Sequence, residues 1–200
     1  MYNFRFSVPT TIYFGKGQIS HLSELADFGS KVLLVYGGGS IKRNGIYDTA
    51  LKILEDAGVT VTELSGVEPN PRIETVRRGV ELCKEQKLDM VLAIGGGSAI
   101  DCAKVVAAGA MYDGDAWDLV LDPSKIKKAL PIFSVLTLAA TGSEMDCFAV
   151  ISDMTKNEKW GTGAKRMVEL CREQGVAEPE WVVQNGTVTI IFKRPPVYGP

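Results

Sequence analysis

Two glycine-rich segments are the residues whose types and spacing most clearly favour ligand chemistry. Each follows a short apolar run, Val32 to Tyr36 for the first and Met90 to Ile94 for the second. Glycine lets a backbone approach a ligand without a Cβ, and free N–H groups at the start of a following helix attract phosphate. The second segment therefore predicts a pyrophosphate site, with a tight turn that needs glycine as the alternative for that loop considered alone. The residues of the two segments are Gly37, Gly38, Gly39, Ser40, Gly95, Gly96, Gly97 and Ser98.

Polar side chains accompany both segments. Asp101 and Lys104 are three residues apart on one helix face, where they can pair or reach toward a bound nucleotide. Thr137 and Thr141 follow an apolar run, and their hydroxyls could bond ribose or phosphate at the carboxyl edge of a sheet. The alternative for these threonines is a capped turn. Asn70 stands between two prolines that stiffen its loop and offers a further polar ligand.

The spacing of the glycines differs from the GxGxxG fingerprint of Rossmann proteins. The richest loop follows a later strand rather than the first one, so a different dinucleotide-binding fold is required. The first loop contains no acidic residue that would hold the ribose 2′-hydroxyl and repel a 2′-phosphate. Lys42 and Arg43 follow that loop. The sequence therefore favours NADP(H) over NAD(H).

The elements that must position these residues alternate between strands and helices. Alternation of this kind predicts an α/β fold with a parallel, doubly wound sheet. We also expect a strand at Thr11 to Phe14, a helix carrying His21 and Leu25, and a short strand at Phe148 to Ile151. The main predicted strands are 32–36, 59–64, 89–94 and 132–138, and the predicted helices are 46–57, 72–86 and 98–110.

The composition changes after about Asp153. We predict a dinucleotide-binding domain over residues 1–153, a junction over 154–163 and a tail over 164–200. The tail contains an amphipathic helix at 164–174 and a hairpin at 182–192 around an Asn-Gly turn. A helix and a hairpin of this size cannot bury an independent core, so the tail must dock on the main domain or on a partner.

The overall composition limits the classes of protein. The 200 residues are 46% hydrophobic and carry a net charge of −2, which excludes a disordered chain and gives no attraction for nucleic acid. There is no apolar run long enough to cross a membrane and no signal peptide in residues 1–10, so we expect a cytoplasmic protein. The four scattered cysteines and the single histidine do not suggest a metal site.

Four motifs, taken together, resemble one family. They are YGGGSIKRNGIYD at 36–48, GVEPNPR at 66–72, GGGSAIDCAK at 95–104 and TLAATGSEMD at 137–146. In order and spacing these motifs resemble the amino-terminal half of iron-containing alcohol dehydrogenases, in particular the butanol dehydrogenase-like, NADP-preferring branch. The resemblance extends from near residue 1 to about residue 153.

The resemblance implies a dinucleotide domain like that of dehydroquinate synthase, followed by a helical domain that binds catalytic iron or zinc. It implies that Gly38, Gly39 and Ser40 face the adenosine ribose and that Asn70 lies near the adenine. Asp101 also falls on a motif position. The pyrophosphate and the rest of the cofactor are implied to contact Gly96, Gly97, Ser98, Thr137, Leu138 and Thr141.

The chain also departs from the family pattern. The family's metal ligands, one aspartate and three histidines, lie in the helical half, so no metal ligand and no catalytic residue can be assigned here. Lys159 falls where the family has a cofactor-contacting lysine. However, residues 158–181 and the following hairpin resemble the carboxyl-terminal tail of ATP-binding transcriptional regulators or RecG-like helicases. We therefore expect a fusion of two fragments.

These observations leave three functions open. The first is an oxidoreductase that transfers hydride between NADP(H) and a small alcohol or aldehyde. The second is a truncated module that binds the dinucleotide without turnover. The third is an interaction protein whose glycine loops are vestigial. Homo-oligomerisation, or burial by residues 158–194, is expected to cover apolar surface left by the absent helical half.

Overall fold

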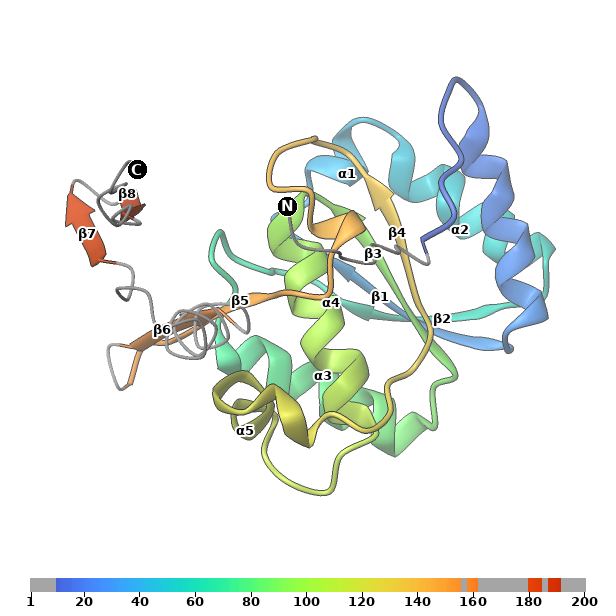
Figure 1. Ribbon diagram of the computed structural model, residues 1–200. Coiled ribbons are helices and arrows are strands. Elements are labelled where there is room, and N and C mark those ends of the chain that lie inside the picture. Colours follow the sequence, from blue (N-terminus) through green and yellow to red (C-terminus); the bar gives the residue numbers. More distant parts are fainter. Residues whose placement is uncertain (1–9, 156–157, 162–179, 185–186, 192–200) are drawn as a thin grey trace, which may run out of the picture.

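The computed structural model describes residues 10–155, 158–161, 180–184 and 187–191. Its centre is a four-stranded parallel sheet with the order β2-β1-β3-β4, seen in Figure 1. The strands are β1 (Lys31–Tyr36), β2 (Thr60–Leu64), β3 (Met90–Gly95) and β4 (Ile132–Leu136). The sequence therefore correctly predicted an α/β fold with a parallel sheet.

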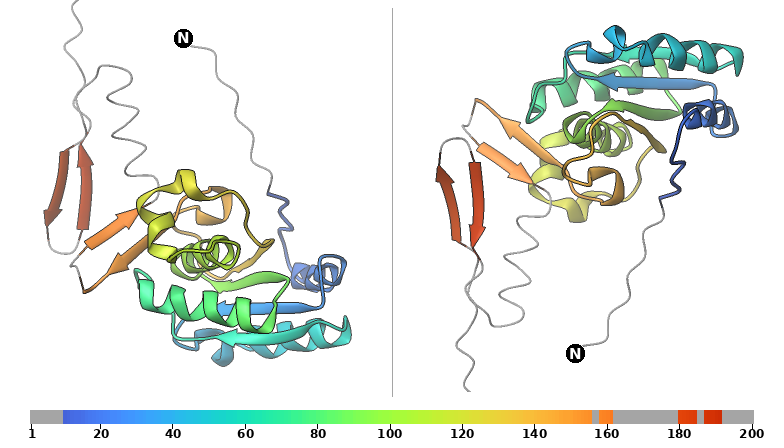
Figure 2. Two further views of the ribbon diagram at one scale, coloured as in Figure 1. Left: turned by 90° about the horizontal axis from the view of Figure 1, so that it is seen from below. Right: turned by 90° about the horizontal axis from the view of Figure 1, so that it is seen from above.

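Helices cover both faces of the sheet. The chain forms α1 (Ser40–Arg43), α2 (Ile46–Asp56), α3 (Ile73–Gln86), α4 (Gly97–Ala110), α5 (Ala116–Leu121) and the 3₁₀ helices η1 (Gln18–Asp27), η2 (Pro123–Lys125) and η3 (Ser143–Met145). One apolar core joins α3, α4 and α5 to one face of the sheet, and the other joins η1, α1 and α2 to the opposite face. Figure 2 shows these layers from two sides.

The two cores explain why β1 and β3 are apolar along nearly their whole length. Successive side chains of a strand point to opposite faces, so a strand covered on both faces needs apolar residues throughout. In β1, Leu33 and Val35 join the core of α3 and α4, while Val32, Leu34 and Tyr36 join the core of α2. Strands of this kind appear in the sequence as continuous apolar runs.

The segment before β1 differs from the prediction. Residues 11–14 form no strand, and the Phe14 side chain is 95% exposed. The apolar residues there suggested a strand, but no described strand pairs with the segment. The expected helix that carries His21 is the 3₁₀ helix η1, in which Leu22 and Leu25 are buried. Their separation of three residues matches the period of a 3₁₀ helix.

The last described elements are two antiparallel pairs. The strand expected at 148–151 is β5 (Val150–Asp153), which pairs with β6 (Glu158–Gly161) and is not a member of the central sheet. β7 (Glu180–Gln184) pairs with β8 (Thr187–Ile191), in agreement with the predicted hairpin. The predicted turn at 185–186 and the predicted helix at 164–174 lie outside the described residues.

No helix within the described ranges is long and apolar enough to cross a membrane.

Candidate functional site

Three loops meet where the parallel strands end, at the upper edge of the sheet in Figure 1. They follow β1, β3 and β4. The Thr137 N–H donates to the Gly95 carbonyl at 2.9 Å, which joins the last two loops directly. Open α/β sheets bind their ligands at this carboxyl edge, so the loops define the candidate site.

The loop after β1 has open space at its centre. A Cβ added to Gly38 would meet no atom within 4 Å, whereas at Gly37 it would lie 3.2 Å from the Val67 carbonyl oxygen. Gly39 has a φ of +92°, which favours glycine, and it precedes Ser40 at the start of α1. The chain can therefore admit a ligand at Gly38 while its neighbours fix the course of the backbone.

The loop after β2 joins the same site. The Gly66 N–H donates to the Gly37 carbonyl at 3.3 Å, and the Val67 N–H donates to the Tyr36 carbonyl at 3.1 Å. Asn70 follows in this loop with a φ of +56°, a left-handed conformation that asparagine tolerates better than most residues. The structure thus brings the loop that carries Asn70 to the carboxyl end of β1.

The loop after β3 leads into α4. Gly96 is the N-cap of this helix, and no side chain caps the first turn, which contains Gly97 and Ser98. An uncapped first turn leaves backbone N–H groups that suit a phosphate. A Cβ at Gly97 would lie 2.6 Å from Thr141 Oγ1, and one at Gly96 would lie 3.8 Å from Leu138 Cβ. The loop after β4 therefore lies directly over the glycines.

Asp101 and Lys104, which the sequence placed on one helix face, are bridged by hydrogen bonds to Ser143. Ser143 Oγ donates to Asp101 Oδ1 at 2.6 Å and accepts from Lys104 Nζ at 2.9 Å. The Val150 N–H donates to Asp101 Oδ2 at 2.9 Å. Burial raises the pKa of Asp101, while the hydrogen bonds from Ser143 and Val150 act in the opposite direction. Asp101 thus lies at the base of the loop after β4.

Lys159 stands apart from the other predicted residues. It lies in β6, where its backbone is in register with Ser152 of β5. Figure 1 shows β6 beside α5, away from the glycine loops. The structure therefore brings together Asp101 and the loops that follow β1, β2, β3 and β4, but it does not bring Lys159 to them.

The sequence reasoning missed an acidic residue near the first glycine loop. Tyr36 and Tyr47 both donate their hydroxyl groups to the Glu63 carboxylate, the latter at 2.6 Å. Lys42 Nζ lies 3.5 Å from Glu63 Oε2 and 4.2 Å from the centre of the Tyr47 ring. Burial tends to raise the pKa of Glu63, but the hydrogen bonds from both tyrosines, together with Lys42, lower it below its ordinary value.

A signal for Glu63 was present in the sequence. The acidic residue that contacts ribose in Rossmann proteins stands about 20 residues after the glycine loop, at the end of the second strand. Glu63 is the penultimate residue of β2 and is in register with Leu34 of β1. The spacing alone does not show where this carboxylate lies. The pairing of β1 with β2 places it close to Tyr36, at the end of β1.

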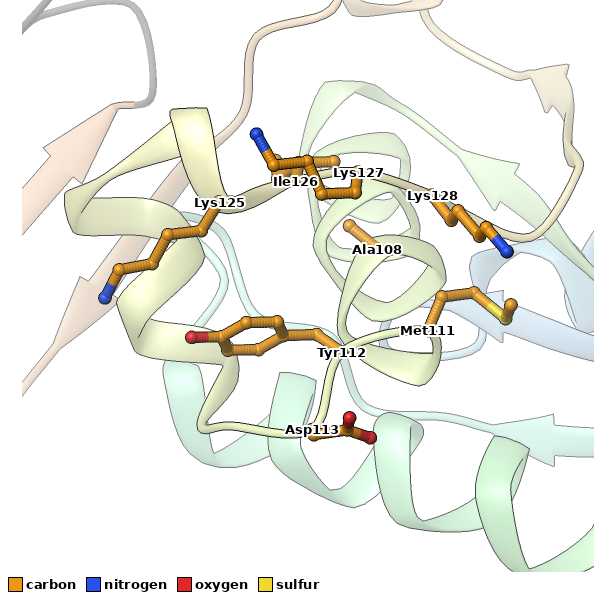
Figure 3. A pocket seen from close by; sticks show the side chains of 8 residues that line it. All are labelled: Ala108, Met111, Tyr112, Asp113, Lys125, Ile126, Lys127 and Lys128. Carbon is orange, nitrogen blue, oxygen red and sulfur yellow. The ribbon is translucent and has the colours of Figure 1, made fainter.

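A separate hollow lies at the other end of α4, and Figure 3 shows it. Its volume is about 200 Å³. α4 has 14 residues, so its two ends are about 20 Å apart and the hollow is distant from the glycine loops. It is lined by Ala108, Met111, Tyr112, Asp113, Lys125, Ile126, Lys127 and Lys128.

The fold defines an α/β class of protein with a parallel four-stranded sheet, and the comparisons identify the family. The iron-containing alcohol dehydrogenase family matches residues 9–169, and the chain belongs to this family. This match includes the predicted junction at 154–163 and the first residues of the predicted tail. The remainder of the tail is unassigned, and its resemblance to regulators and helicases stays a prediction.

Named relatives differ in the cofactor that they use. NADH-dependent butanol dehydrogenase A of Clostridium acetobutylicum is 63% identical over 164 residues, which are 82% of this chain and 42% of that protein. NADPH-dependent aldehyde reductase YqhD of Escherichia coli is 46% identical over 162 residues, 80% of this chain and 41% of the reductase.

A solved structure supports the same assignment. NADH-dependent butanol dehydrogenase A of Thermotoga maritima superposes with a TM-score of 0.78 at 50% identity, over 80% of this chain and 41% of that one. The chain therefore spans about two fifths of the length of the relatives that it matches.

The family name implies iron, and the described residues do not fit a metal ion. Within residues 10–155, 158–161, 180–184 and 187–191 there is no group of three histidine, cysteine, aspartate or glutamate side chains that could hold one. A catalytic metal usually has three protein ligands. No metal-dependent step is therefore assigned to these residues.

Proposed function

We propose that this chain binds NAD(P)H across the carboxyl edge of its sheet, in a domain of the dehydroquinate synthase-like type. The observation that carries the proposal is the open space at Gly38 and Gly96. Neither position has a left-handed backbone, and an added Cβ would meet nothing closer than 3.8 Å at either one. Steric conflict within the protein therefore does not explain glycine at these positions, whereas close approach of a ligand does.

We assign the parts of the dinucleotide to the loops as follows. Gly37, Gly38, Gly39 and Ser40 hold the adenosine ribose, and Asn70 lies on the adenine side. Gly95, Gly96, Gly97 and Ser98 hold the pyrophosphate at the start of α4. Thr137, Leu138 and Thr141 line the nicotinamide side, and Asp101 lies at its base. Lys159 is included only because of its position in the family motif, since β6 does not lie beside these loops.

We further propose a preference for NADP(H) over NAD(H). The loop from Gly37 to Ser40 has no acidic side chain, and Arg43 is exposed just after it. Glu63 does not change this proposal, because Tyr36, Tyr47 and Lys42 already engage its carboxylate. Four relatives at 55–63% identity are named NADH-dependent, so the ratio of the dissociation constants for NADPH and NADH is the direct test.

The reaction proposed for the whole family member is the interconversion of a small alcohol and an aldehyde. The bound nicotinamide would supply the hydride chemistry, and this chain's loops would orient it. A second candidate is a module that binds the dinucleotide without turnover. The absence of a metal-binding group from the described residues favours this candidate for the chain itself.

Thermal unfolding with and without nucleotide tests the proposal. We expect NADPH and NADH to raise the melting temperature, because a ligand that binds only the folded state stabilises it. ATP at the same concentration serves as the comparison nucleotide. An aldehyde-reduction assay with and without added iron or zinc is expected to show no turnover. Failure of both dinucleotides to raise the melting temperature would leave only the interaction-protein hypothesis.

A further inference from the structure

Lys104 connects α4 to the segment that follows β4. Its ammonium group donates to Ser143 Oγ at 2.9 Å, to Asp146 Oδ1 at 2.8 Å and to the Phe148 carbonyl at 2.7 Å. An ammonium group has three N–H donors, so all of them are used. The Lys104 side chain is 14% exposed, which shields these charge-assisted bonds from water. One side chain thus fixes three points of a loop.

Asp101 strengthens the same connection one helical turn earlier. Its two carboxylate oxygens accept from Ser143 Oγ and from the Val150 N–H. Ser143 is 3% exposed and lies between the carboxylate and the ammonium group. The segment from Ser143 to Val150 is therefore held to α4 at both of its ends.

The residues just before Ser143 form the part of the loop that covers the glycines. The Thr137 N–H bonds to the Gly95 carbonyl, and Thr141 Oγ1 lies 2.6 Å from the Cβ position of Gly97. Any side chain at position 97 would therefore collide with the loop, so the loop lies close over the Gly97 backbone. A shift of the loop away from α4 would widen the space above the start of that helix.

We infer that Lys104 is a positioning residue, which holds residues 137–146 over the Gly95–Ser98 loop and thereby shapes the nicotinamide side of the site. The inference deepens the proposed function and rests on it, because the loop is taken to line the dinucleotide. Lys104 itself contacts the loop and is not assigned a contact with the ligand.

The electrostatics agree with this role. Burial raises the pKa of Asp101, and the nearby charge of Asp146 raises it further, while the charge of Lys104 lowers it. Loss of the lysine charge would leave the Asp101 and Asp146 carboxylates without this compensating cation. The loop would also lose its three bonds to Lys104, while the bonds from Ser143 and Val150 to Asp101 would remain.

Hydrogen exchange on the full chain tests the positioning role without any ligand. The reporters are the Met145, Phe148 and Val150 amides, whose N–H groups are bonded to Gly142, Asp146 and Asp101. We expect Lys104→Met to speed exchange of these amides about tenfold or more. Lys104→Arg keeps the charge and is expected to restore most of the protection. Unchanged exchange in Lys104→Met would overturn the inference.

Lys84→Met is the matched control. Lys84 Nζ also donates to a backbone carbonyl, that of Tyr112, but it lies on α3 away from the loop. We expect this variant to leave exchange at Met145, Phe148 and Val150 unchanged. Equal loosening of these amides in both variants would show a general loss of stability and would contradict a specific role for Lys104.

Calorimetric titration adds a second measurement, which distinguishes binding of the nicotinamide half of the ligand from binding of the adenosine half. We expect Lys104→Met to weaken NADPH binding about tenfold while leaving the affinity for 2′,5′-ADP, which lacks the nicotinamide half, unchanged. An equal loss for both ligands would overturn the inference. If the unmodified chain binds neither, the proposed function fails, and the exchange of the three amides alone decides whether Lys104 positions the loop.

Discussion

At the scale of single residues, substitutions of Gly38 and Gly96 test whether a ligand lies close to the backbone there. We expect Gly38→Ala and Gly96→Ala to leave the melting temperature unchanged or slightly raised, because alanine fits both backbones and restricts the unfolded chain. The same changes should weaken NADPH binding about tenfold or more, since a methyl group would occupy ligand space. Fluorescence titration of NADPH measures the affinity.

Lys128→Ala is the control for these glycine variants, because Lys128 lines the hollow at the far end of α4. It is expected to leave the affinity unchanged. Glycine variants that bind NADPH as tightly as the unmodified chain would contradict the assignment of the two loops.

The cysteines provide a second test at the residue scale. Burial raises the pKa of both the Cys83 and Cys102 thiols to about 12, so at pH 8 few of these thiols are ionised, whereas Cys147 is exposed. The thiolate is the reactive form. In a Cys171→Ser variant, we expect a thiol reagent at pH 8 to label Cys147 rapidly and the other two only after unfolding. Rapid labelling of Cys102 in the folded chain would contradict the packing of α4.

At the scale of elements, the contact between α3 and α4 depends on Gly79. A Cβ at this position would lie 2.7 Å from Leu64 Cδ2 and 2.8 Å from Val106 Cγ2, both on buried residues. Overpacking lowers the free energy of unfolding by about 1–3 kcal/mol. The higher helix propensity of alanine than of glycine raises it by about 1 kcal/mol. We expect Gly79→Ala to lower the free energy of unfolding by about 1 kcal/mol.

Urea unfolding measures this change, and Glu81→Ala on the exposed side of the same helix is the control. The control is expected to change the free energy of unfolding by less than about 0.5 kcal/mol. A Gly79→Ala variant that is more stable than the unmodified chain would contradict the prediction. It would show that α3 and α4 can move apart without loss of stability.

The elements also show which parts of the fold a sequence can predict. β1 and β3 were predictable because burial on both faces requires continuous apolar runs. α5 was missed because its six residues are too few to show a helical period, even though Asp115 caps it by accepting from the Trp117 N–H. The strand expected at 11–14 was wrong, because a short run of apolar residues does not by itself supply a partner strand.

The candidate site was predictable to a similar extent. Glycine loops after apolar runs indicated the carboxyl edge, and in the parallel sheet the loops after β1 and β3 do lie at that edge. The position of Glu63 beside Tyr36 depends on the pairing of β1 with β2, and the bonds of Lys104 to residues about 40 positions later depend on the path of the chain after β4. Local patterns contain little information about such distant contacts.

At the scale of the whole molecule, exposed apolar side chains raise the question of what covers them. Phe28 packs edge-on against Phe133 of β4 yet remains over half exposed, and Phe14 is 95% exposed. Our prediction remains that residues 158–194, or a second copy of the chain, bury such surface. A chain ending after Gly161 keeps the β5–β6 pair and should self-associate more strongly in analytical ultracentrifugation. An unchanged sedimentation mass would contradict a covering role for the tail.

The central claim is that this part of an iron-containing alcohol dehydrogenase binds a dinucleotide by itself. Isothermal titration of the metal-free, full chain with NADPH and then with NADH tests this claim most directly. We predict saturable binding of one molecule per chain, with the tighter dissociation constant for NADPH. The absence of heat with either dinucleotide would contradict the claim.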